Sequence, residues 1–136
     1  MTDQELMDMA KKAAEYAYVP YSKFPVGAAL ECSDGTIFTG CNVENAAYGA
    51  TICAERTAMV KAVSEGHRDF DTIVIAGRSE DYCVPCGTCR QVMMEFCQPE
   101  TFQIILAVDE ENYKVCSLRE LFPFGFGPDN LQERDK

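Results

Sequence analysis

Three cysteines and one glutamate are the residues of this sequence whose spacing most clearly predicts chemistry. Glu55 follows Cys53 by two positions, and Cys86 and Cys89 are separated by two residues behind a proline. Three thiolates can bind one zinc ion and leave its fourth coordination position open, whereas a structural zinc site fills that position with another Cys or His. A carboxylate beside an open zinc position is the minimum equipment for activating water. We therefore predict one zinc ion per chain, bound by these three cysteines, with Glu55 as the catalytic acid/base.

Both cysteine motifs fall at the N-termini of predicted helices, which cover residues 53–64 and 87–97. Free backbone N–H groups and the positive end of the helix dipole stabilise thiolates there. Three thiolates leave a divalent ion with a net negative charge, which opposes the ionisation of a bound water. Arg56 and Arg90 are the candidates for compensating charge, because guanidinium donors can hydrogen-bond thiolate sulfur. We assign this role to Arg56, next to Glu55, and leave it open for Arg90; the alternative for each is an arginine on the helix surface.

Cys83 leaves a second interpretation of the cysteines open. With Cys86 and Cys89 it forms a C-x2-C-x2-C spacing, which is typical of iron–sulfur clusters. The pattern fails at its next element, because position 93 is Met. The only histidine, His67, lies in a predicted helix-to-strand turn, and we assign it no role. The remaining thiols lie in apolar patterns and are expected in the core: Cys32, Cys41, Cys97 and Cys116.

Composition limits the class of partner and the compartment. The formal net charge of −10 over 136 residues argues against a nucleic-acid partner, because phosphates are bound largely by Lys and Arg. No apolar run approaches the ~20 residues of a membrane helix. The first residues lack the basic region of a signal peptide, so we expect a cytoplasmic protein. In that compartment, eight cysteines favour metal binding and free thiols over disulfides.

The hydrophobic pattern predicts alternating helices and strands. A capping-box pattern, Thr2-x-x-Glu5, opens a first helix that is expected to run to about Tyr18 and to stop before Pro20. Asp34-Gly35 predicts a hairpin turn. These patterns favour an α/β fold with a mixed five-stranded sheet layered between helices, in a single domain over residues 1–136. The predicted strands are 26–32, 37–41, 71–76, 102–108 and 113–116; a short helix is expected over 117–122 and a solvated tail over 129–136.

The two cysteine motifs resemble the zinc motifs of the free-nucleoside cytidine deaminases, a family within the wider zinc deaminases that use Cys ligands and a non-ligand Glu. The resemblance covers nearly the whole chain, in order. Because the first ligand is Cys rather than His, it points to the small, homotetrameric branch. Besides residues 53–58 and 85–91, the matching blocks are 24–29, 40–48, 121–123 and 126–128.

This resemblance implies a fold, a reaction and further site residues. The fold would be cytidine-deaminase-like, and the reaction would be hydrolytic deamination of cytidine and 2′-deoxycytidine in pyrimidine salvage. Phe24 would pack on the pyrimidine, and Asn42 and Glu44 would hydrogen-bond the ribose 3′-hydroxyl. Phe126, or the neighbouring Phe124, would cover the base in an adjacent subunit. The other residues implied to bind substrate are Ala46 and Tyr48, which would reach a neighbour's nucleoside, and Ala54.

Two alternative functions remain open at this point. One keeps the deaminase chemistry but changes the substrate to an aminonucleoside antibiotic or a base in RNA. The acidic charge argues against RNA, and the Asn42-x-Glu44 pair favours a free ribose. The other is a zinc-stapled structural module, which predicts a closed metal site and no need for Glu55.

Overall fold

The computed structural model describes residues 1–77 and 82–132 and contains one five-stranded mixed sheet, as predicted. The spatial order of the strands is β2-β1-β3-β4-β5, with β3 and β4 parallel and every other neighbouring pair antiparallel. Each strand lies within two residues of its predicted bounds. The strands are β1 (Val26–Cys32), β2 (Ile37–Cys41), β3 (Phe70–Gly77), β4 (Gln103–Ala107) and β5 (Tyr113–Ser117).

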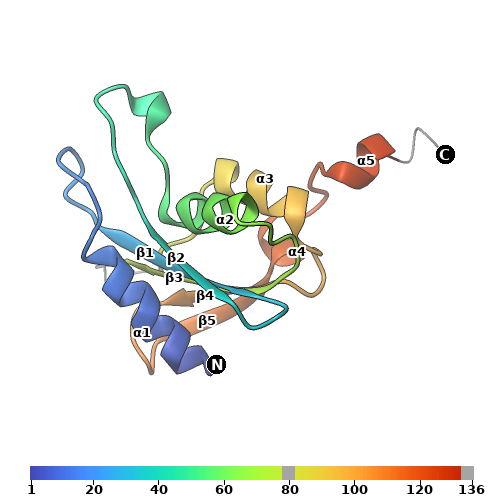
Figure 1. Ribbon diagram of the computed structural model, residues 1–136, viewed down its shortest axis with the longest axis horizontal. Helices are drawn as coiled ribbons and strands as arrows, with labels where there is room; N and C mark the ends of the chain where they lie inside the picture. Colours follow the sequence, from blue (N-terminus) through green and yellow to red (C-terminus); the bar gives the residue numbers. More distant parts are fainter. Residues whose placement is uncertain (78–81, 133–136) are drawn as a thin grey trace.

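Helices cover both faces of the sheet, which gives the predicted three layers (Figure 1). Helix α1 (Asp3–Ala14) packs on one face, where its Leu6, Met7 and Ala10 meet alternate residues of the central strands. Helices α2 (Ala54–Ser64) and α3 (Gly87–Phe96) pack on the other face, beside the short α4 (Leu118–Leu121). Because successive strand residues point to opposite faces, β3 supplies both cores, Ile73 and Ile75 to one and Val74 and Ala76 to the other.

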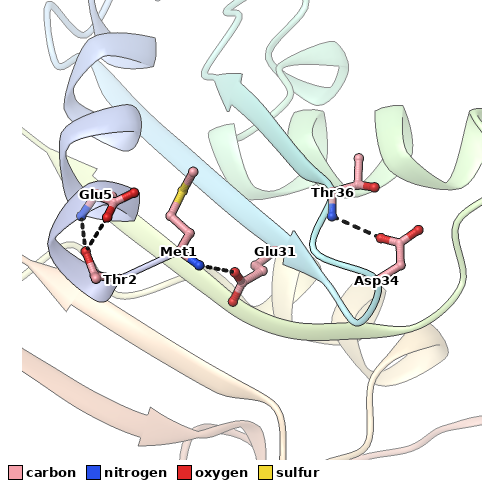
Figure 2. A network of polar contacts seen from close by, with 6 residues as sticks. All are labelled: Met1, Thr2, Glu5, Glu31, Asp34 and Thr36. Carbon is pink, nitrogen blue, oxygen red and sulfur yellow. Dashed lines mark hydrogen bonds and ion pairs between the residues drawn. The ribbon is translucent and has the colours of Figure 1, made fainter.

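Helix α1 begins as the sequence predicts but ends earlier. The Thr2 hydroxyl accepts a hydrogen bond from the Glu5 backbone N–H and donates to the Glu5 carboxylate, both at 3.2 Å (Figure 2). The carboxylate thus bonds the cap hydroxyl, not the cap backbone N–H of a full capping box. The predicted end near Tyr18 is wrong. Tyr18 instead pairs with the 42–44 segment, since its N–H bonds the Asn42 carbonyl and its carbonyl accepts from Glu44 N–H.

Two glycines let the helices approach the sheet closely. A Cβ atom at Gly27 would lie 1.9 Å from the Ala10 carbonyl oxygen of α1. A Cβ at Gly40 would lie 2.5 Å from the Ala58 nitrogen and 2.7 Å from the Ala54 carbonyl oxygen of α2. Only glycine permits such contacts between backbones. Gly40 therefore sets the depth at which α2 sits on β2.

The 42–52 loop and the C-terminal segment that carries α5 (Pro128–Gln132) project from the layered body (Figure 1). The loop contains a 3-10 turn, η1 (Tyr48–Ala50), that the sequence does not predict. Helix α5 forms where we expected a solvated tail; residues 133–136 of that tail lie outside the described residues. Within the described residues, no helix is both long and apolar enough to cross a membrane.

Candidate metal centre and substrate site

The N-termini of α2 and α3 bring three thiols together. Cys53 is the N-cap residue of α2 and Cys86 is the N-cap residue of α3, while Cys89 lies in the first turn of α3. The Sγ atoms of Cys53 and Cys86 are 3.8 Å apart, and those of Cys86 and Cys89 are 3.6 Å apart. All three sulfurs lie within 4.8 Å of one another. Helices α2 and α3 pack side by side on one face of the sheet, and this packing brings their N-terminal cysteines together (Figure 1).

The donor set and its spacing fit a zinc ion. Tetrahedral coordination with Zn–S bonds of about 2.3 Å requires sulfur–sulfur separations of roughly 3.8 Å, close to those observed. Cys83 does not belong to this group of three, although it packs against the same core. Among the described residues the cluster thus has three protein ligands, which leaves one tetrahedral position for water or substrate.

The electrostatics of the thiols favour a bound cation. A hydrogen bond with the Cys89 thiol, together with the Arg56 guanidinium, lowers the pKa of Cys53 to about 5. The same bond to Cys53, with burial, raises the pKa of Cys89. One thiolate therefore forms readily, and a metal ion displaces the remaining thiol protons when it binds.

Glu55 is a buried acid in the first turn of α2. Its side chain is only 5% exposed, which is unusual for a glutamate. Burial raises the pKa of its carboxyl group, and the negative Cys53 sulfur adds to this effect. A solvated acid, the alternative for any glutamate at a helix start, is excluded by this burial. A carboxyl group whose pKa is raised above its usual value holds a proton more readily, which suits a residue that must both accept and donate one.

The two candidate arginines occupy different environments. Arg56 Nη2 lies 3.7 Å from Cys53 Sγ and donates to the Thr51 carbonyl at 3.0 Å, so its charge is held beside the thiol cluster. Arg90 Nη1 instead donates to the Leu121 carbonyl at 2.6 Å, which ties α3 to the C-terminal segment. The geometry thus supports charge compensation by Arg56 and gives Arg90 an anchoring contact.

The residues expected to bind the nucleoside meet in one polar network at the start of β1. The Asn42 side chain accepts from Val26 N–H and donates to the Phe24 carbonyl, both at 2.9 Å. The Glu44 carboxylate accepts from the N–H groups of Tyr21 and Ser22 at 3.0 and 3.1 Å, and from the Ser22 hydroxyl. These bonds fix the backbone on both sides of Phe24.

Phe24 lies at the same end of the sheet as the thiol cluster. A Cβ at Gly77, the last residue of β3, would lie 3.3 Å from the Phe24 ring and 3.5 Å from Cys83 Cβ. The charges of Glu55 and Cys53 in turn contribute to the raised pKa of Cys83, which is about 11. Desolvation is the larger cause of that shift.

The other expected substrate residues are not gathered around the thiols by this chain alone. Ala54 is fully buried at the start of α2, between Cys53 and Glu55. Tyr48 is 78% exposed on the 42–52 loop, where its ring packs edge-on against Tyr21. Phe126 is half-exposed and Phe124 fully exposed, although Gln91 of α3 donates to the Phe126 carbonyl at 2.8 Å. Ala46 is likewise exposed on the 42–52 loop.

Ser22 is the residue of this network that the sequence analysis missed. Its hydroxyl donates to Glu44 and accepts from Phe24 N–H at 3.1 Å, so it links the carboxylate to the aromatic residue. The signal was present, because a serine two residues before Phe24 and two after Pro20 is typical of a side-chain-stabilised turn. Lys23 between them adopts a positive φ of 58°, a strained conformation of the kind found at functional sites.

Comparison with known proteins identifies the family. Residues 1–105 match the family described as the cytidine and deoxycytidylate deaminase zinc-binding region. The chain is 47% identical to the cytidine deaminase of Sporosarcina psychrophila, with 96% of both chains covered. It is 44% identical to that of Halalkalibacterium halodurans, with 98% of this chain and all of the relative covered.

Solved structures give the same result for the fold. The crystal structure of cytidine deaminase from Burkholderia pseudomallei is 46% identical, with a TM-score of 0.88 over 93% of this chain and 100% of the other. That from Mycobacterium tuberculosis is 37% identical, with a TM-score of 0.78 over 93% of this chain and 99% of the other. The fold, the three clustered thiols and the full-length matches agree, and the chain belongs to the cytidine deaminase family.

Proposed function

We propose that the chain catalyses the zinc-dependent hydrolytic deamination of cytidine and 2′-deoxycytidine, with uridine or 2′-deoxyuridine and ammonia as products. The observation that carries the proposal is a buried carboxyl group, Glu55, next to three thiols spaced for zinc with one ligand position left over. Full-length similarity to cytidine deaminases supports the activity, which is that of a hydrolase. We further propose a role in pyrimidine salvage, as the family resemblance implies.

The chemistry divides between the metal and the protein. Zinc, when bound by the three thiols, supplies the Lewis acidity that lowers the pKa of water toward ~7. Glu55 takes a proton from the water and delivers it to N3 of the pyrimidine, so that C4 becomes open to attack. Hydroxide then adds to C4, and Glu55 carries the proton of the new C4 hydroxyl to the amino group, which leaves as ammonia when the C4–N bond breaks. The raised pKa of Glu55 suits these proton transfers, because the carboxyl group must hold a proton between the two steps.

Binding of the nucleoside is proposed for the network around Phe24. The Phe24 ring packs on the pyrimidine, and the Asn42 and Glu44 side chains bond the ribose 3′-hydroxyl through their remaining hydrogen-bonding capacity. Ala54 contributes through its backbone. The Asn42 and Glu44 groups already hold the Phe24 segment in place, so base and sugar recognition are parts of one assembly.

The alternative functions have less support than cytidine deamination. A structural zinc module predicts a closed site and a dispensable Glu55, whereas only three thiols cluster among the described residues and Glu55 is buried two residues after Cys53. An RNA base is disfavoured by the net charge of −10. No observation favours an aminonucleoside antibiotic over cytidine.

We also propose a homotetrameric assembly and a cytoplasmic location. Exposed aromatic residues on the projecting segments support a homotetramer in which Ala46, Tyr48 and Phe126 complete a neighbour's site. A cytoplasmic location is supported by eight cysteines that are all free thiols.

A direct test measures turnover and metal on the same sample. Purified protein should deaminate cytidine and 2′-deoxycytidine, followed by the change in pyrimidine absorbance, and should contain zinc at one ion per thiol cluster. Removing zinc with a chelator should abolish turnover, and adding it back should restore it. Zinc-loaded protein that turns over neither nucleoside would contradict the proposal.

A further inference from the structure

A second cluster of metal-binding side chains lies at the far end of the sheet. The ligand atoms of Cys32, Asp34 and His67 all fall within 4.8 Å of one another. Cys32 ends β1 opposite Phe70 at the start of β3, whereas Gly77 beside Phe24 ends β3. The cluster is therefore separated from the thiols of the active site by the length of these strands.

The spacing of the donors suits a small divalent ion. The distance from His67 Nδ1 to Asp34 Oδ2 is 3.6 Å. Tetrahedral zinc with ligand bonds of about 2.0–2.3 Å places neighbouring donors roughly 3.4–3.8 Å apart. Thiolate, imidazole and carboxylate together form a ligand set that zinc and similar borderline ions accept, and that Mg²⁺ and Ca²⁺ do not prefer.

The three donors come from two segments, since Cys32 and Asp34 belong to the β1–β2 hairpin and His67 to the turn between α2 and β3. In the hairpin turn, Asp34 Oδ1 accepts a hydrogen bond from Thr36 N–H at 3.0 Å (Figure 2). The other carboxylate oxygen, Oδ2, lies 3.6 Å from His67 Nδ1. Cys32 N–H donates to the Thr36 carbonyl at 2.9 Å. The His67 ring packs edge-on against Phe38 at 5.0 Å between ring centres. Little side-chain freedom would be lost when an ion binds, because these side chains are already placed.

Solvent reaches the cluster from the side of Asp34 and His67, and further acidic residues lie nearby. A cavity of about 410 Å³ opens at this point, and Asp34 and His67 lie in its wall with Asp69. Asp71 is also near, because it accepts a hydrogen bond from Ser33 at 2.9 Å. The neighbouring cation does not fill the site, since the Arg68 guanidinium donates to the carbonyls of Val63 and His67 at 2.7 and 2.9 Å.

We propose that Cys32, Asp34 and His67 bind a second divalent ion, zinc in the first instance, independently of the ion at the active site. Binding releases the thiol proton of Cys32 to solvent and involves no change of oxidation state. Two anionic donors and one neutral imidazole neutralise the ion, and water takes the fourth position. The ion joins the β1–β2 hairpin to the α2–β3 turn, so it stabilises the folded chain by binding only that state.

The single histidine makes this site directly observable. Zinc-loaded, untagged protein, freed of excess metal, is titrated with further Zn²⁺ while the imidazole signals of His67 are followed by NMR. We expect a saturable change that completes with one added equivalent per chain, together with a rise in the thermal midpoint. Cytidine turnover should stay the same throughout.

Two aspartate variants distinguish direct ligation of the second ion by Asp34 from general electrostatic attraction by nearby acidic residues. Asp34→Asn keeps an oxygen for the Thr36 bond but removes the anionic ligand, so it should weaken the second zinc at least about tenfold, since even loss of a ligand's supporting contact costs about that much. Asp69→Asn removes the same charge from the cavity wall and should leave the affinity nearly unchanged. The proposal is overturned if His67 signals do not respond to zinc, if Asp34→Asn binds as tightly as wild type, or if both variants weaken binding equally.

Discussion

At the scale of single residues, Glu55 is the group on which turnover should depend most. Glu55→Gln keeps the shape of the side chain but cannot move protons, so turnover should fall by about 10²- to 10⁴-fold while zinc content and fold are retained. The same change at exposed Glu65, which caps the other end of α2, serves as the control and should have no effect. Steady-state kinetics and metal analysis of both variants test this. Near-normal turnover in Glu55→Gln would show that Glu55 has another role.

Arg56 is the residue that we expect to supply the positive charge that a three-thiolate site needs. Arg56→Ala removes the donor 3.7 Å from Cys53 Sγ, and activity or zinc affinity should fall by about 10- to 100-fold. Arg56→Lys should recover part of the loss, because it keeps the charge without the planar fork. Arg119→Ala removes an arginine from an exposed ion pair and is the matched control. Unchanged kinetics and metal content in Arg56→Ala would refute charge compensation.

Ser22 should position Phe24 without taking part in the chemistry. Ser22→Ala removes the hydroxyl that joins Glu44 to Phe24 N–H, and bonds to charged groups are worth about 1.5–3 kcal/mol. We therefore expect KM for cytidine to rise about tenfold or more while kcat changes little. Ser33→Ala breaks another serine–carboxylate bond, at the far end of the sheet, and should leave KM unchanged. A fall in kcat at constant KM would contradict the positioning role.

Residue spacing predicted the thiol cluster and favoured Arg56 over Arg90 for charge compensation, but it did not give the contact that Arg90 makes instead. Cys53, Cys86 and Cys89 each lie within a few residues of a helix start, so local signals fixed where their side chains would point. Arg56 follows Cys53 by three positions and lies next to Glu55, whereas Arg90 directly follows Cys89. What separates them in the structure is a long-range contact, the Leu121 carbonyl that binds Arg90, and no local pattern encodes it.

At the scale of elements, the depth of α2 on the sheet should control the metal centre. Gly40→Ala would place a Cβ 2.5–2.7 Å from backbone atoms of α2, which cannot rotate away. Overpacking of this kind costs about 1–3 kcal/mol. Because α2 carries Cys53 and Glu55, zinc affinity and turnover should fall along with the thermal midpoint. Gly49→Ala meets nothing within 4 Å and is the control; equal behaviour of the two variants would contradict the argument.

Strands and helix starts were predictable because alternation, caps and turn residues act over a few positions. The end of α1 was not. Its apolar spacing continues through Ala13 and Ala17, but the backbone of Tyr18 is taken up by the 42–44 segment, 24 or more residues away. The same pairing brings Glu44 under the turn that precedes Phe24. The predicted end of α1 is therefore wrong at the point where Tyr18 pairs with the 42–44 segment, and that same pairing assembles the proposed nucleoside site.

At the scale of the whole molecule, one chain leaves large aromatic groups without cover. Phe124 is fully exposed and Phe126 half-exposed, although the backbone around them is tied to α3 through Gln91 and Arg90. Phe124 also adopts a positive φ of 56°. A backbone held in place while its rings face outward suits a surface that meets another subunit, and burying such rings removes an aggregation liability. This supports the proposed homotetramer with shared sites.

Phe126→Ala should weaken substrate binding without changing metal binding. If Phe126 covers the pyrimidine of an adjacent subunit, losing an aromatic contact worth about 0.5–1.5 kcal/mol should raise KM by roughly 2- to 12-fold while zinc content stays the same. Phe124→Ala is the matched variant, and a larger effect there would move the assignment to Phe124. Sedimentation at assay concentrations gives the oligomeric state alongside the kinetics. An active monomer would contradict the shared site, because an isolated chain could not borrow an aromatic ring from its neighbour.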